Sequence, residues 1–109
     1  MYVVVFHVPQ SHLDQVKDAM FAAGAGRIGS YERCCHQIPG LGQFTPSDGA
    51  HPYLGTVGIP EFVDEYRVEM VVENHLIRPV IEALIGAHPY EVPSYHIIEV
   101  QTLEQIAPT

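Results

Sequence analysis

The stretch Gly86-Ala87-His88-Pro89-Tyr90-Glu91-Val92-Pro93 decides the fold, because it ends an apolar helical segment and opens a final strand. Pro89 has no amide donor and biases His88 away from helical backbone angles, so the helix is expected to end there. Pro93 restricts the residue before it in the same way, which makes the connection stiff and extended. The apolar residues that follow predict a strand from about Tyr95 to Gln101.

Upstream of this stretch lie the helix itself and a longer strand. Asn74 is expected to cap the helix, and Pro79 fits only within its first turn or at a bend. A strand from about Phe62 to Glu73 alternates apolar residues with charged ones, which predicts a half-buried strand. Its charged side is expected to form ion pairs across the sheet or at an oligomer interface and consists of Glu65, Arg67 and Glu69.

The first half of the chain repeats the strand–helix–strand order. Residues 2–8 predict a strand that is apolar at both parities, with Val3 and Val5 on one side, as is typical of a strand buried on both faces. Ser11 is expected to cap a helix that ends at Gly24, which suits the left-handed position after a helix. A second strand is expected from about Ser30 to Ile38.

Two glycine-rich segments connect these elements. Residues 24–29 superficially match a dinucleotide-binding fingerprint, but they leave a helix and enter a strand, which is the reverse of the required context. They therefore predict a turn. The segment from Pro39 to Pro60 is too long for a hairpin turn, so we expect a functional excursion that Phe44, Tyr53 and Leu54 could anchor.

The element order predicts an α+β fold of the ferredoxin-like type, formed by one domain over residues 1–109. Two strand–helix–strand units give a four-stranded antiparallel sheet with both helices on one face and a long inserted loop. The other face retains Val3 and Val5. Association with identical chains is the simplest way to cover such a face, so the sequence predicts a homo-oligomer.

Composition excludes several classes of partner. The chain has 109 residues, a formal net charge of −8 and only five Lys and Arg, which argues against binding nucleic acid or an anionic membrane surface. A cationic ligand or a divalent ion suits this charge. No apolar run is long enough to span a membrane, and the first nine residues lack a secretory signal. The only cysteines, Cys34 and Cys35, are adjacent, so free thiols in the cytoplasm are expected.

Several short motifs carry a resemblance to a known family. The closing segment, residues 87–93, resembles that of the CutA divalent-ion tolerance family, which shares the PII-like trimeric ferredoxin fold. A closer resemblance, over nearly the whole chain, is to the CutA-like module inserted in YqfO-type proteins of the NGG-one-interacting-factor-three family, and here that module is expected to stand alone. Its motifs occur in one order at residues 21–31, 34–35, 42–46, 49–55, 57–58, 66–69 and 87–93.

The resemblance implies a trimer with clefts between subunits. It does not imply hydrolase activity, because the family's paired metal site lies in flanking domains, on histidines and carboxylates that this chain lacks. The basic nucleotide-binding loop of PII proteins also has no counterpart here.

The seven histidines make a divalent metal ion the one cofactor to consider. On a strand, Cys34 and His36 would point to one face and form a half-site that needs a further ligand from another segment or chain. Alternatively, these are ordinary core and surface residues. His51 and His88, each followed by Pro-Tyr, could meet if the long loop folds back on the closing segment, which predicts a cleft with oxygen atoms from Tyr90 and Glu91. In the structural alternative, His88 caps carbonyls at the end of the helix.

No catalytic constellation is present, so we expect a non-enzymatic homo-oligomeric binding or regulatory domain that takes a small ligand or divalent ion between subunits. The alternative is a protein-interaction module that docks on a metal-centre partner protein. A third hypothesis is a thiol-dependent enzyme, which would need a base and an electropositive setting at Cys34 or Cys35.

Overall fold

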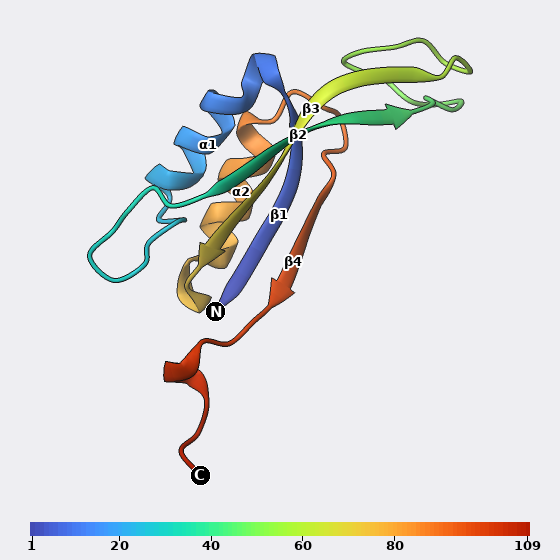
Figure 1. Cartoon of the computed structure of the whole chain (residues 1–109). Helices are drawn as coiled ribbons and strands as arrows, with labels where there is room; N and C mark the ends of the chain where they lie inside the picture. Colours follow the sequence, from blue (N-terminus) through green and yellow to red (C-terminus); the bar gives the residue numbers. More distant parts are fainter.

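The computed structural model describes all 109 residues and has the predicted strand–helix–strand order twice (Figure 1). Three short 3₁₀ turns, at Gln10–His12, Asn74–Leu76 and Leu103–Gln105, accompany the main elements. No helix is long and apolar enough to cross a membrane. The strands and helices are β1 Tyr2–Pro9, α1 Leu13–Ala22, β2 His36–Phe44, β3 Glu61–Val72, α2 Ile77–Ala87 and β4 Tyr95–Glu99.

The four strands form one antiparallel sheet in the order β2-β3-β1-β4. Both helices pack against the same face of this sheet (Figure 1), so the predicted ferredoxin-like arrangement is confirmed. The central strand β1 pairs with β3 along its whole length, from Tyr2 opposite Val72 to Pro9 opposite Glu65. Strands β2 and β4 lie at the two edges.

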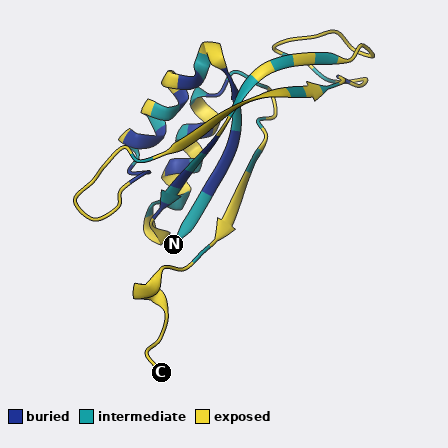
Figure 2. Cartoon of the chain, viewed as in Figure 1, coloured by how far each residue is buried: buried dark blue, intermediate teal, exposed yellow.

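One hydrophobic core fills the space between the sheet and the helices. Alternate residues of β1 and β3 point towards the inward sides of α1 and α2, which Figure 2 shows as buried. The amphipathic spacing of apolar residues in both helices explains why each presents one buried stripe. The fully buried members with the largest side chains are Phe6, Met20, Met70 and Leu84.

The sheet face that carries no helix, hereafter the open face, is partly apolar. On β1 it presents Val3, Val5 and His7. On β3 the residues directly opposite them are Val71, Glu69 and Arg67. On β4, Ile98 lies opposite Val3 and His96 opposite Val5. Val5 is only 3% exposed although no helix covers it, because it lies on the central strand. Towards the edges the apolar side chains are more open: Ile38 of β2 is 46% exposed and Ile98 of β4 is 47% exposed.

The second strand starts and ends later than the sequence predicts. Residues 30–35 form no strand; Ile28 and Tyr31 make an isolated bridge and Arg33 adopts a positive φ of 58°. Strand β2 instead runs from His36 through Pro39 to Phe44. The long loop is therefore shorter than expected and covers residues 45–60.

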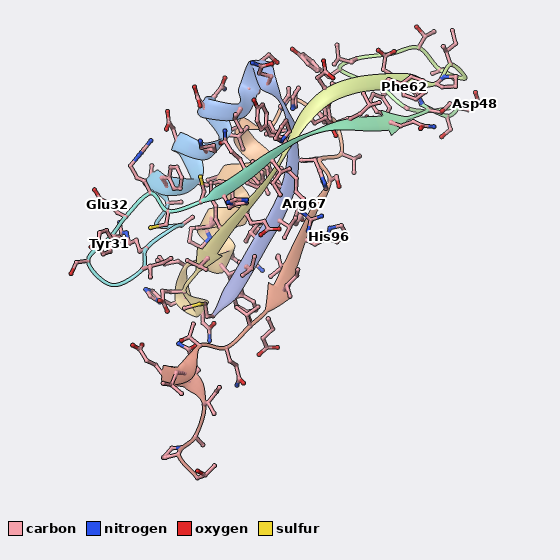
Figure 3. The ribbon with its side chains drawn as sticks, in the orientation of Figure 1. Tyr31, Glu32, Asp48, Phe62, Arg67 and His96 are labelled. Atoms are coloured by element: carbon pink, nitrogen blue, oxygen red, sulfur yellow. The ribbon has the colours of Figure 1, made fainter.

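Strands β2 and β3 continue beyond the helical layer as a projecting arm, defined by residues 41–44 and 61–64 with the loop between them (Figure 1). Figure 3 shows Asp48 and Phe62 on this arm, far from Tyr31 and Glu32 in the loop that precedes β2. The arm exposes Leu41 by 69% and Phe62 by 57%.

The helix ends differ from the predictions in their caps. Each α-helix begins with a 3₁₀ turn, and neither Ser11 nor Asn74 makes a side-chain cap. Asn74 instead accepts a hydrogen bond from the N-terminal amine of Met1, which ties β1 to the start of α2. Pro79 lies in the first turn of α2, where its missing amide costs nothing. Gly24 follows α1 with a φ of 109°, as predicted.

Candidate functional site

A cavity of about 370 Å³ lies at the base of the arm, between the loop of residues 45–60 and the closing segment; we call it the distal cavity. Its size falls within the range of small-molecule sites. It is lined by apolar and aromatic side chains with a few polar groups and contains no Lys or Arg. The lining residues are His7, Gln43, Phe44, Pro46, Ala50, Pro52, Tyr53, Leu54, Glu65, Tyr90, Glu91, Val92 and Ser94.

His88 fixes the closing segment to the sheet just behind this cavity. It is the only buried polar side chain, and its Nε2 lies 2.6 Å from the backbone oxygen of His7. The backbone N–H of Tyr90 donates to its Nδ1 at 3.1 Å. Since Nδ1 accepts, Nε2 must carry the proton and donate, which defines a neutral imidazole.

Burial lowers the pKa of His88 below its ordinary value of 6.5, and this effect outweighs the hydrogen bond to His7 and the charge of Glu65, which both raise it. His88 does cap α2, but through its backbone N–H, which donates to the carbonyl of Leu84; the imidazole caps no helix carbonyl. Its partner is the backbone of β1, and the ring is neutral rather than positive.

Tyr90 extends this set of hydrogen bonds from His88 into the distal cavity. Its hydroxyl donates to Oε2 of Glu65 at 3.0 Å, which joins the closing segment to β3. Burial, followed by the hydrogen bond and negative charge of Glu65, raises the pKa of the Tyr90 hydroxyl well above its usual value. The hydroxyl therefore stays protonated and acts as a donor at any physiological pH.

Aromatic rings gather around Tyr90. Its ring centroid lies 6.0 Å from Phe44, 6.4 Å from Tyr53 and 4.9 Å from His88. Tyr53 also meets His12 edge-on at 5.7 Å. Offset and tilted contacts at these distances are favourable, so the loop is held against the closing segment.

The predicted folding back of the loop is seen in its backbone as well. The N–H of His51 donates to Oε1 of Glu91 at 3.1 Å, which joins the two His-Pro-Tyr motifs. The contact uses the backbone of His51 rather than its imidazole, and that side chain remains exposed. Tyr90 and Glu91 both line the distal cavity.

A second cavity of about 260 Å³, the proximal cavity, lies at the other end of the sheet, beside the start of β2. Both cysteines are free thiols; Cys34 is half-buried and Cys35 exposed. Although residues 34 and 35 are not in a strand, Cys34 still shares this cavity with His36. The lining residues are Val3, Ile28, Cys34, Cys35, His36, Glu69, Met70 and Val71.

No family model matches this sequence. Its curated relatives are bacterial proteins named GTP cyclohydrolase 1 type 2 homolog. The one from Halalkalibacterium halodurans is 41% identical over 97 residues, which are 89% of this chain and 26% of the relative. The one from Mycobacterium leprae is 45% identical over 93 residues, which are 85% of this chain and 24% of the relative. The chain therefore spans about a quarter of the length of the curated relatives it matches.

Solved structures agree. A Bacillus cereus protein related to NIF3 superposes with a TM-score of 0.80 at 37% identity, over 93% of this chain and 26% of that protein. This chain has the CutA/PII-like fold and is similar to a segment of NIF3-related proteins. The PII-like protein CutA from Nostoc sp. PCC 7120 matches with a TM-score of 0.63 at 18% identity, over 97% of this chain and 86% of that one. CutA1 from Pyrococcus horikoshii matches with a TM-score of 0.68 at 16% identity, over 96% of this chain and 88% of that one. These last two likenesses establish the fold alone.

In this CutA/PII-like domain the four predicted metal ligands fall in separate places. Cys34 and His36 line the proximal cavity, His51 lies on the loop at the distal end, and both ring nitrogens of His88 are occupied by protein hydrogen bonds. No three His, Cys, Asp or Glu side chains converge closely enough within one chain to hold a metal ion. The sequence left open whether a third ligand for Cys34 and His36 comes from another segment or another chain, and no other segment of this chain supplies one.

Sequence reasoning assigned Glu65 to an ion pair and missed its place in the distal cavity. Arg67 bonds Glu69 on its own strand at 3.2 Å, which leaves Glu65 to Tyr90. The signal that could have revealed this is Gly42. A Cβ on Gly42 would lie 2.0 Å from Oε1 of Glu65, so the glycine makes room for that carboxylate.

Proposed function

We propose that this CutA/PII-like domain is a non-enzymatic, homo-oligomeric binding or regulatory domain. The observation that carries the proposal is the apolar surface left uncovered by one chain. Only 19 of 109 residues are buried, and large apolar side chains lie exposed on the open face and on the arm. Surfaces of this kind mark interaction sites in soluble proteins.

The shape of the chain supports association. Its radius of gyration is 15.6 Å, whereas a compact domain of this length should have about 13 Å. The excess reflects the projecting arm and the extended C-terminal residues at the opposite end (Figure 1), and the chain measures 54 Å in one direction against 27 and 24 Å in the others. An arm that exposes Leu41 and Phe62 has little stabilising packing of its own, and a neighbouring copy would supply it.

We further propose that the assembly is a trimer, as the PII-like fold suggests, and that a small ligand occupies the distal cavity near a subunit boundary. A divalent ion held by Cys34 and His36 with a ligand from a second chain is a variant of the same proposal. One structural relative, from Archaeoglobus fulgidus, is called the periplasmic divalent cation tolerance protein CutA, which supports this variant. The free thiols support a cytoplasmic location.

Native mass spectrometry of freshly purified protein tests the proposal. We expect a closed oligomer, with the trimer dominant, and any retained ion or small molecule appears as added mass. Sedimentation velocity at micromolar concentration provides the independent measurement. A strict monomer by both methods contradicts the proposal.

A second candidate function rests on the comparisons. The relatives contain this segment as about a quarter of a longer chain, so the segment is compatible with neighbouring domains. The same exposed surface could dock on a separate metal-centre protein. Co-purification of a stoichiometric partner from a native extract, together with a monomeric free chain, favours docking over self-association.

A further inference from the structure

We infer that the distal cavity binds a small organic cation, such as a quaternary or alkylated ammonium group. This inference deepens the proposed function, since it rests on the distal cavity being a ligand site. It follows from three features of the cavity: its aromatic walls, its anchored carboxylates and the absence of any lysine or arginine from its lining.

The walls suit a weakly hydrated cation. Three aromatic rings line the cavity: the ring centroids of Phe44 and Tyr53 lie 6.0 and 6.4 Å from that of Tyr90. The faces of such rings attract cations, and several rings together form the aromatic cages that recognise quaternary ammonium ligands. Half of the remaining lining residues are aliphatic or proline, which matches alkyl groups on nitrogen.

The negative charge of Glu65 is built into the cavity rather than left mobile. Its Oε2 accepts from Tyr90, and its other oxygen lies over the bare Cα of Gly42 on the neighbouring strand. The nearest arginine along the strand, Arg67, is occupied by Glu69, so no ion pair neutralises Glu65. Because this carboxylate is already ordered, it loses less conformational entropy when a ligand binds than a flexible carboxylate would.

Glu91 adds a second carboxylate at the rim. The backbone N–H of His51 fixes it, and this bond leaves its charge uncompensated by any basic side chain. The whole chain carries a net charge of −8, which raises the local concentration of cations and opposes anionic ligands.

An organic cation fits better than a bare divalent ion. Divalent ions require several oxygen, nitrogen or sulfur ligands at short distances, and no three such side chains converge in this chain. A neutral ligand would use the aromatic walls but would cover the half-buried carboxylate of Glu65 without countering its negative charge.

Isothermal titration calorimetry with choline chloride and its uncharged isostere, 3,3-dimethylbutan-1-ol, tests the inference. The two probes have nearly the same shape, so a difference in affinity reports the positive charge. We expect choline to bind about tenfold more tightly, which corresponds to about 1.4 kcal/mol. Equal affinities, or binding of the alcohol alone, overturn the inference.

Two variants identify the site. Glu65→Gln removes the charge, and Gly42→Ala keeps the charge but displaces the carboxylate; each should weaken choline binding about tenfold while binding of the alcohol changes little. Glu104→Gln, on the C-terminal 3₁₀ turn, is the matched control and should bind choline as the natural chain does. Unchanged choline binding in both site variants overturns the assignment to this cavity.

The same samples separate this inference from the proposed function. An oligomer that binds the alcohol as tightly as choline, or that retains only a metal ion, overturns the organic-cation inference. The proposed function then still stands. A monomer that binds choline overturns the oligomeric proposal and supports the inference. An oligomer that binds neither probe removes the ligand-binding part of both.

Discussion

At the scale of single residues, His88 connects three parts of the molecule. It lies at the end of α2, its Nε2 donates to the carbonyl of His7 in β1, and its Nδ1 accepts from the N–H of Tyr90. Because its ring is buried, these bonds have no competing water. The ring therefore sets where Tyr90, and through it Glu65, lies in the distal cavity.

We predict that His88→Leu lowers the free energy of unfolding by about 1–3 kcal/mol, because the His7 carbonyl and the Tyr90 N–H lose their partner. Urea unfolding followed by circular dichroism measures this. His75→Leu is the matched control, since His75 is exposed, and it should change stability by less than about 0.5 kcal/mol. Equal stability of the two variants would mean that the hydrogen bonds of His88 contribute nothing to stability.

The same residue makes stability depend on pH. The folded chain lowers the pKa of His88 from 6.5, so on acidification the unfolded chain takes up a proton first. Its stabilising contribution is therefore complete above pH 6.5 and is lost as the pH falls through the folded pKa, by at most about 1.4 kcal/mol per pH unit. Urea midpoints measured between neutral and mildly acidic pH should fall more steeply for the natural chain than for His88→Leu. Parallel profiles would contradict this assignment.

At the scale of elements, the turn after α1 depends on glycine. Gly26 has a φ of 76°, donates to the carbonyl of Val71 and accepts from the N–H of Cys34. A Cβ there would lie 2.6 Å from the backbone oxygen of Cys34, which cannot move without breaking the turn. This turn therefore holds α1 and the proximal cavity against β3.

We predict that Gly26→Ala lowers the free energy of unfolding by more than about 2 kcal/mol, since strained φ and a backbone clash act together. Gly29→Ala separates the two effects. Gly29 also has a positive φ, of 56°, but nothing lies within 4 Å of an added Cβ. Its substitution is therefore expected to lower the free energy of unfolding by only about 1 kcal/mol. Thermal and urea unfolding of both variants give the comparison; equal losses would show that the clash is relieved.

The elements also show what sequence patterns can and cannot predict. Hydrophobic periodicity gave the order of strands and helices because each pattern reflects one buried stripe. It failed at β2, where Pro39, Gly40 and Gly42 argued for a loop. Strand β2 is an edge strand that pairs only with β3, and an edge tolerates a proline that cannot donate.

The candidate site was predictable only in part. The repeated His-Pro-Tyr motif correctly suggested that the loop meets the closing segment near Tyr90 and Glu91. Gly42 was the one sequence signal for the place of Glu65, but the bond of Glu65 to Tyr90 was not predictable, because it joins residues 25 positions apart. Alternation along a strand specifies the face of a side chain but not its partner.

At the scale of the whole molecule, one chain is an elongated body with a helical layer on one side and an open sheet face on the other (Figures 1 and 2). The helical layer completes the core on its side. The open face has no such layer, and Ile38 and Ile98 at its edges are 46% and 47% exposed. Burial of these side chains by a second copy would add favourable apolar area at about 25 cal/mol per Å².

We predict that the double variant Ile38→Glu with Ile98→Glu dissociates the oligomer, because two carboxylates would be buried in an apolar interface without partners. Native mass spectrometry should show a monomer, whereas circular dichroism should show the fold retained, since both side chains are already half-exposed in one chain. Ile85→Glu is the control: Ile85 is 48% exposed on α2, outside the open face, and its substitution should leave the assembly intact. An oligomer that survives the double variant but is lost in Ile85→Glu would place the contact on the helical layer, and the open face would then need another explanation.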